Sequence, residues 1–327
     1  MASKIIISLL TVLAGVSAAL ALYWLLNKLA ELLPGRSEHR IKPFLYILPA
    51  YLAITLYLIY PAIQTVIDSF RDQASVEFVG TENYTELLSS AAFRDTIYNT
   101  FLWILIVPAT TVVIGLAVAV LADRLGPKSE NFVKTVIFLP MAVSLVGASL
   151  VWNFIYEARP AGQPQVGLLN AFIGVFGIDP VAWLEQSDFH FNSLLLMLVL
   201  LWSQVGFSMV LLSAAVKGVP GDTLEAARID GASERQIFFQ VVVPQIKGTI
   251  ITVYVTVTIG TMKTFDIVYT MTNGRFNTNV IGNEFWNQLS TFFNNGRAAA
   301  IVVMLMTAVI PIMIYQVRHF RAEEAAA

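Results

Sequence analysis

The chain has 327 residues, of which 57% are hydrophobic and only 13% are charged, and its mean hydropathy is +0.70. A soluble domain carries about 25% charged residues, so this composition excludes an ordinary water-soluble protein and indicates a membrane protein. The net charge of −2 argues against nucleic-acid binding, and the absence of cysteine excludes disulfides, thiolate metal sites and a cysteine nucleophile.

Seven stretches of the chain are long and apolar enough to cross a bilayer, which takes about 20 residues of helix. They predict an all-α integral membrane protein with seven transmembrane helices. Six of them are uncharged runs, bounded by residues 4 and 28, 42 and 68, 95 and 123, 134 and 157, 190 and 217, and 297 and 318. The remaining one, at about 249–271, is unusual because it contains Lys263 and Asp266.

The first apolar run follows Lys4, a pattern that a cleaved signal peptide also shows. Orientation favours an uncleaved helix, because basic loops stay in the cytoplasm. Alternate connections hold 13 and 6 Lys and Arg residues, and the basic loop 28–42 belongs to the richer set only if the first helix stays. We therefore expect residues 1–41 to form an extra helix with a cytoplasmic loop, with the amino terminus outside and the carboxyl terminus in the cytoplasm.

Two long connections, at about 68–99 and 157–192, are expected on the outer side. The second contains apolar patches at 166–176 and 181–184, which fit either helices lying in the membrane surface or a packed loop. Trp183 favours the surface helix, because tryptophan prefers the headgroup layer.

The connection at 218–247 has the pattern of a helix, a glycine break and a second helix. Asp222 with Glu225, and Ser233 with Gln236, have the spacing of capping boxes. Gly231 between them can supply the positive φ of a sharp turn. We therefore expect a short two-helix elbow on the cytoplasmic side.

This connection resembles the EAA loop of ABC importer permeases, in which Glu-Ala-Ala, a later glycine and a hydrophobic-Pro pair recur. The matching residues here are Glu225, Ala226, Ala227, Gly231 and Pro244. The resemblance implies that the elbow, including Asp230, docks on a cytoplasmic ATPase and couples ATP hydrolysis to transport. It also implies a permease domain over residues 42–327, with the EAA loop at 218–247.

Further motifs are similar to those of sugar-type permeases, and the likeness covers about residues 42–320. They are Phe78-Val79-Gly80 with Asn83-Tyr84, Phe93, Asn99-Thr100, and Phe265 to Tyr269 followed by Thr272-Asn273-Gly274. The sequence departs from the usual pattern in its extra amino-terminal helix and in Gly274-Arg275-Phe276, where Gly-Gly-Pro is usual. With these features it looks most like the permeases of α-glucoside importers.

The chain contains no Gly-x-x-x-x-Gly-Lys-Ser/Thr phosphate-binding loop, so we do not expect it to be an enzyme or to bind a cofactor itself. The three histidines lie far apart, so no metal site is expected. The resemblance implies two ATPase subunits that bind ATP and Mg²⁺, a second permease forming a heterodimer, and an external solute-binding protein. The assembly would lie in the bacterial inner membrane and carry a sugar.

Polar and aromatic side chains inside the spans can mark a substrate path, because lipid burial is costly for them, although the same residue types also hold membrane helices together. The candidates are Trp152, Asn153, Tyr156, Ser203, Gln204, Phe207, Ser208, Thr261, Thr264 and Tyr269. By resemblance, Gln204, Phe207, Thr261 and Thr264 fall near positions that line the sugar site of related permeases.

Lys263 and Asp266 allow a second hypothesis, an ion-coupled secondary transporter. On a continuous helix their spacing of three would let them pair or carry a proton. We favour a structural salt bridge, because the pair lies beside the sugar-permease motif.

Overall fold

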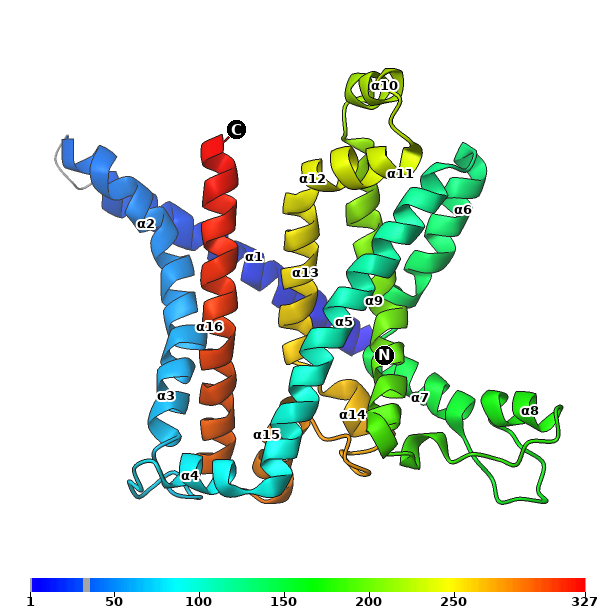
Figure 1. The fold of residues 1–327 in the computed structure, drawn as a ribbon. Helices are drawn as coiled ribbons and strands as arrows, with labels where there is room; N and C mark the ends of the chain where they lie inside the picture. The colour runs from blue at the N-terminus through cyan, green and yellow to red at the C-terminus, as the bar shows by residue number, and fades with distance from the viewer. Residues whose placement is uncertain (1, 32–35, 327) are drawn as a thin grey trace. The chain divides into compact units, whose positions relative to one another are not determined.

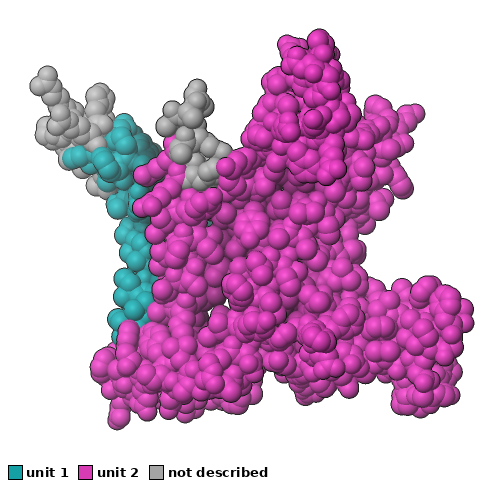
Figure 2. Space-filling model, viewed as in Figure 1, with its two compact units in different colours: residues 1–67 teal, residues 68–327 magenta. Residues whose placement is uncertain are grey.

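The computed structural model of the chain describes residues 2–31 and 36–326. These residues are mostly helical, and the described part contains only one isolated β-bridge, between Arg71 and Phe78. The chain divides into two compact units, Met1–Ile67 and Asp68–Ala327, which are coloured separately in Figure 2. The predicted all-α membrane fold is thereby confirmed.

The first unit consists of α1 (Ala2–Glu31), α2 (Arg36–Ile54), a π-helical turn (Thr55–Ile59) and α3 (Tyr60–Asp68). The hydroxyl of Tyr46 donates to Asn27 Oδ1 at 2.9 Å, and the rings of Tyr46 and Tyr23 stack at 6.0 Å, so α1 and α2 pack together. Most apolar side chains of this unit are exposed, which suits helices surrounded by lipid.

The second unit contains the remaining helices, most of which Figure 1 labels. They are α4 (Glu82–Ser89), α5 (Ala91–Asp123), α6 (Pro127–Phe138), α7 (Leu145–Tyr156), α8 (Leu168–Gly174), α9 (Phe191–Lys217), α10 (Gly221–Ile229), α11 (Glu234–Ile237), α12 (Val243–Gln245), α13 (Lys247–Met262), α14 (Asp266–Met271), α15 (Ile281–Trp286) and α16 (Asn295–Ala326). Short 3-10 turns lie at Leu139–Ala142 (η2), Trp183–Glu185 (η3) and Asp188–His190 (η4), and π-helical turns lie at Phe238–Val242 and Asn287–Thr291.

Five helices of the described chain are long and apolar enough to cross a membrane, and two bent helix pairs bring the number to as many as seven. The sequence predicted the spans but not these bends. The predicted span at 134–157 turns by 102° between η2 and α7. Pro140 lies in the 3-10 turn, and Ser144 restarts the helix by accepting the N–H of Gly147 on its hydroxyl at 3.1 Å.

The predicted continuous span at 249–271 is also wrong, because α13 ends at Met262 and α14 begins at Asp266. Lys263 and Phe265 leave the helical conformation, with φ, ψ of −96°, 8° and −137°, −52°. Lys263 and Asp266 therefore flank a break, and among the described residues they form no ion pair with each other. The expected salt bridge is absent because the helical spacing on which it depended is absent.

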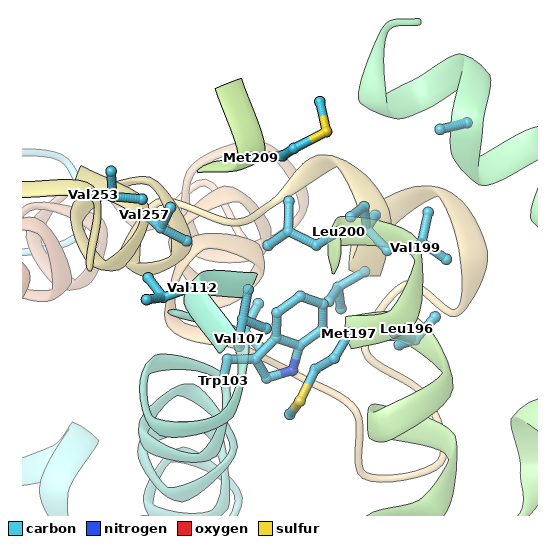
Figure 3. Packing of buried hydrophobic residues seen from close by; sticks show 14 of the residues in the cluster. Trp103, Val107, Val112, Leu196, Met197, Val199, Leu200, Met209, Val253 and Val257 are labelled. Carbon is cyan, nitrogen blue, oxygen red and sulfur yellow. The ribbon is translucent and has the colours of Figure 1, made fainter. Parts of the chain in front are cut away.

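The core of the second unit is formed by α5, α9 and α13, which meet around Trp103, Met197 and Val253 (Figure 3). Gly206 allows α9 to touch the chain of α6 and η2, since a Cβ at this position would lie 2.5 Å from the carbonyl oxygen of Ile137. This close packing positions the middle of α9, where four of the candidate substrate residues lie.

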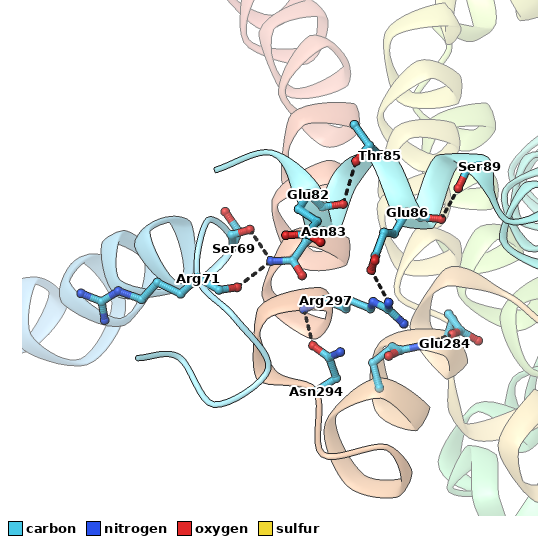
Figure 4. A network of polar contacts seen from close by, with 11 residues as sticks. Ser69, Arg71, Glu82, Asn83, Thr85, Glu86, Ser89, Glu284, Asn294 and Arg297 are labelled. Atoms are coloured by element: carbon cyan, nitrogen blue, oxygen red, sulfur yellow. Dashed lines mark hydrogen bonds and ion pairs between the residues drawn. The ribbon is translucent and has the colours of Figure 1, made fainter. Parts of the chain in front are cut away.

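Several residues of the sugar-permease motifs hold loops of the second unit together. Asn83 donates to the carbonyl oxygens of Ser69 and Arg71 at 3.0 and 2.7 Å, within the network of Figure 4. The side chain of Asn99 in α5 donates to the carbonyls of Asn277 and Asn279 at 2.7 and 3.1 Å. These amides satisfy backbone groups of loops that have no regular secondary structure.

Candidate functional site

A cavity of about 440 Å³ lies between η2, α7, α9, α13 and α14, and we call it the transmembrane cavity. It brings together four of the sequence candidates, Gln204, Phe207, Thr261 and Thr264. The rest of its lining is Met141, Leu145, Leu200, Thr256, Val257, Gly260, Lys263 and Asp266.

Helical spacing explains why the α9 residues share this cavity. Leu200, Gln204 and Phe207 follow one another at intervals of four and three, so they lie along one face of the helix. On the opposite wall, the break after Met262 brings Thr264 to the cavity. Gly282 of α15 packs against this break, because a Cβ there would lie 2.5 Å from the carbonyl oxygen of Thr264.

The polar groups of the transmembrane cavity are largely unpaired. Thr261 donates its hydroxyl to the carbonyl of Val257 at 2.8 Å, but the side chains of four other lining residues have no hydrogen-bond or ion-pair partner among the residues described. They are Gln204, Lys263, Thr264 and Asp266. Unpaired polar groups are costly in hydrocarbon, so this cavity fits water or a ligand rich in hydroxyl groups. Sequence reasoning favoured a pair of Lys263 and Asp266 and left open whether they contact substrate, and the structure places both in the lining of this cavity.

The other candidate substrate residues lie outside the transmembrane cavity. Ser203 and Ser208 are buried, and Ser208 packs where α5 and α9 touch, since a Cβ on Gly115 would lie 2.8 Å from its Cβ. Tyr269 stacks on Phe265 with ring centroids 4.9 Å apart.

The candidate substrate residues of α7 lie toward the carboxyl end of this helix. The ring of Trp152 packs against those of Tyr156 and Trp202 at 5.4 and 6.0 Å. Tyr156 is buried, and its hydroxyl donates to the carbonyl of Leu195 at 3.1 Å. Asn153 and Tyr156 line a second cavity, which shares no lining residue with the first.

The expected elbow is formed by α10 and α11, which project from the end of the second unit at the top of Figure 1. Gly231 joins them with a φ of +83°. The N–H groups of Gly231 and Ala232 donate to the carbonyls of Arg228 and Ala227, both at 3.0 Å, which is the bonding pattern of a Schellman motif. The positive φ expected at Gly231 is therefore confirmed.

The two predicted caps of the elbow differ in outcome. At Ser233 the capping box forms, with the Ser233 N–H donating to Gln236 Oε1 at 2.8 Å and the Gln236 N–H donating to Ser233 Oγ at 3.4 Å. The cap predicted at Asp222 is wrong, because α10 begins at Gly221 after Pro220 and has no side-chain cap. Asp222 therefore lies in the first helical turn, and Glu225 is exposed without a capping role.

One face of the elbow packs inward and the other is free. Ala227 lies against a small cluster formed by Val219, Ile237, Val242 and Ile246, which also contacts α5, α9 and α13. Glu225, Ala226 and Asp230 are exposed on α10 and its carboxyl end.

An ion pair ties the two arms of the elbow together on its surface. Arg228 Nε and Glu234 Oε1 lie 2.9 Å apart, and this hydrogen-bonded pair raises the pKa of Arg228. The ion pair and the Schellman turn hold α10 and α11 together as one unit. This unit contacts α9 and α13, which line the transmembrane cavity, through the small apolar cluster.

The chain is similar to permease proteins of known transport systems. The family model described as binding-protein-dependent transport system inner membrane component matches residues 111–322, which include the elbow and the lining residues of both cavities. The chain is 42% identical to the alpha-glucoside transport system permease protein AglF of Rhizobium meliloti (strain 1021), over 98% of each chain. It is also 42% identical to the osmoprotective compounds uptake permease protein GgtC of Synechocystis sp., over 86% of this chain and 99% of that protein.

The fold is also similar to that of a solved transporter chain. In the crystal structure of a bacterial alginate ABC transporter in complex with an alginate pentasaccharide-bound periplasmic protein, one chain matches with a TM-score of 0.74. The match covers 86% of this chain and 96% of that chain at 19% identity, which supports the fold.

Proposed function

Given that this chain belongs to the family of binding-protein-dependent transport system inner membrane components, and is a permease of an ABC importer, we propose that it translocates an α-glucoside or a similar oligosaccharide. The observation that carries this proposal is the set of unpaired polar groups in the transmembrane cavity. Amide, hydroxyl, carboxylate and ammonium groups can hydrogen-bond sugar hydroxyls, and the ring of Phe207 offers an apolar face for sugar C–H groups. The alpha-glucoside permease that matches 98% of this chain supports the same substrate class.

A glucosylated polyol is a second candidate substrate. The relative that takes up osmoprotective compounds is as similar in identity as the alpha-glucoside permease. A glucosyl polyol has the same hydroxyl-rich surface, so the transmembrane cavity suits both ligands.

We further propose that transport is driven by partner subunits. In this scheme two ATPases bind ATP and Mg²⁺, a second permease completes a heterodimer, and an external solute-binding protein delivers the sugar. The exposed residues Glu225, Ala226 and Asp230, beside Gly231, would lie in the ATPase contact. Closure of the ATPase pair would then move the elbow and switch the helices between two packings.

The proposed orientation has the amino terminus outside and the carboxyl terminus in the cytoplasm of a bacterial inner-membrane assembly. It rests on the thirteen basic residues of the alternate loops. We also propose that residues 1–41 are an addition to a permease domain at 42–327.

The substrate class can be tested by competition in proteoliposomes that contain this chain, both ATPases, the second permease and the binding protein. Uptake of labelled maltose should be inhibited by unlabelled trehalose, another α-glucoside, and hardly affected by glycine betaine. Uptake of labelled glycine betaine without any maltose uptake would refute the sugar proposal.

A further inference from the structure

The second cavity has a volume of about 460 Å³, and we call it the outer cavity. It and the transmembrane cavity lie at opposite ends of the packed helices α7 and α14. Leu145 and Asp266, at the starts of these helices, line the transmembrane cavity, whereas Tyr156 and Met271, at their ends, line the outer one. In Figure 1, α7 and α8 lie at the end of the second unit away from the elbow.

A single buried amide holds the wall of the outer cavity in place. Asn170 of α8 donates to the carbonyls of Glu157 and Val181 at 2.9 and 3.0 Å. Its Oδ1 accepts the backbone N–H of Val181 at 2.9 Å and the indole N–H of Trp183 at 3.1 Å. Gly167 brings α8 against the same wall, because a Cβ there would lie 2.0 Å from the carbonyl oxygen of Glu157. The wall is therefore preformed, as in small-molecule binding sites.

The lining of the outer cavity combines an aromatic ring with neutral and acidic hydrogen-bonding groups. The Trp183 ring is fixed at its N–H edge, and the side chains of Asn153 and Glu185 have no hydrogen-bond or ion-pair partner among the described residues. Glu157 is paired with Arg159 at 3.3 Å. Because no Lys or Arg is among the described lining residues, the cavity does not favour an anion such as a lipid phosphate.

We propose that the outer cavity is a second carbohydrate-binding subsite, which holds a glucosyl unit before that unit reaches the transmembrane cavity. Trp183 provides the flat apolar surface, and Asn153 and Glu185 bind the hydroxyl groups. A quaternary ammonium ligand is the rival, since it also binds to aromatic rings and carboxylates. It is disfavoured because Arg159 already neutralises one of the two carboxylates and Tyr156 is held by Leu195. This inference rests on the proposed function, because the substrate class, an α-glucoside, comes from it.

The test uses the full chain in lipid nanodiscs and saturation-transfer NMR with maltose as the probe. The background carries Gln204→Ala and Thr264→Ala, which weaken maltose binding in the transmembrane cavity, so the outer cavity contributes a larger share of the signal. Trp183→Ala and the milder Glu185→Gln are each expected to raise the dissociation constant for maltose about fivefold to tenfold. Trp24→Ala removes an exposed tryptophan that lines neither cavity and should leave the signal unchanged.

The inference is overturned if maltose gives no signal in this background, or if its binding is the same with and without Trp183 and Glu185. Choline that binds and displaces maltose would assign the cavity to cations instead. The uptake assay with labelled maltose distinguishes this failure from failure of the proposed function. A transporter that imports maltose normally with Trp183→Ala and Glu185→Gln would keep the sugar assignment and lose only the outer subsite.

Discussion

The backbone N–H of Ala232 donates to the carbonyl oxygen of Ala227 at 3.0 Å and closes the carboxyl end of α10. The bond depends on the residue just before Ala232, because Gly231 has a φ of +83°. Nothing lies within 4 Å of a Cβ built on Gly231, so the backbone conformation, and not lack of space, makes glycine favourable there.

We predict that Gly231→Val leaves the protein inserted in the membrane and uncouples ATP hydrolysis from uptake. A side chain in the left-handed region costs about 1–2 kcal/mol, and a β-branched one is especially unfavourable, so the turn between α10 and α11 should change shape. Gly231→Asn is the matched control, because asparagine tolerates this conformation. Substrate-stimulated ATPase activity and uptake in the reconstituted transporter should fall with valine and largely persist with asparagine. Normal coupling with valine would remove the elbow from the transmission path.

Glu225→Ala should have a milder effect, confined to the partner contact. Since Glu225 caps no helix, we expect the free energy of unfolding to change by less than about 0.5 kcal/mol. Stimulated ATPase activity should nevertheless decrease, because an exposed carboxylate is removed from the proposed docking surface. Asp222→Ala on the same helix serves as the acidic control for both readouts. A clear loss of thermal stability in Glu225→Ala but not in Asp222→Ala would contradict this prediction, because it would show that Glu225 stabilises the fold.

Gln204→Ala and Thr264→Ala should each reduce transport more than assembly. A lost hydrogen bond to sugar is worth about 1 kcal/mol, which corresponds to about a fivefold loss in the efficiency of uptake. Ser208→Ala is the control, because its buried hydroxyl has no partner among the described residues and faces the α5 contact. Initial uptake rates at several maltose concentrations provide the comparison. If both cavity variants transported like the control, these residues would not lie on the path.

Lys263 and Asp266 should be only weakly coupled in stability. A double-mutant cycle of Lys263→Met and Asp266→Asn, read by thermal unfolding, is expected to give a coupling energy of no more than about 1 kcal/mol, because the two side chains line the same cavity but form no ion pair. A coupling energy well above that value would restore the salt bridge that a continuous helix predicts.

Hydropathy could predict where the chain crosses the membrane but not the direction of the backbone within a span. The runs that became α5, α9 and α16 are continuous helices, as expected. The runs at 134–157 and 249–271 have similar composition and are bent or broken. Pro140 and Ser144 carried a signal for the first bend, whereas Lys263 and Asp266 marked the second run as unusual without indicating that the helix breaks there. At that break the chain packs closely against Gly282, which is distant in the sequence.

The parts of the candidate site that depend on local turns and caps could be predicted from the sequence. The parts that depend on which neighbouring helix a residue packs against could not. Gly231 and Ser233 behave as their sequence indicates, because turns and caps are local. Ser208, like Thr264, is a hydroxyl residue inside a predicted span, yet it packs against α5 and does not line the cavity. Which face of a helix meets a neighbour is a tertiary property, so a polar residue inside a span cannot by itself be assigned to a path.

The energy source of uptake tests the central claim most directly. Proteoliposomes containing this chain with its second permease and ATPases, supplied with binding protein and maltose outside, should take up maltose when ATP and Mg²⁺ are enclosed. Uptake should stop when the ATPases are omitted, and it should be unchanged when a protonophore collapses any proton gradient. Maltose uptake by this chain without ATPases, driven by an imposed ion gradient, would contradict the account and support the ion-coupled transporter.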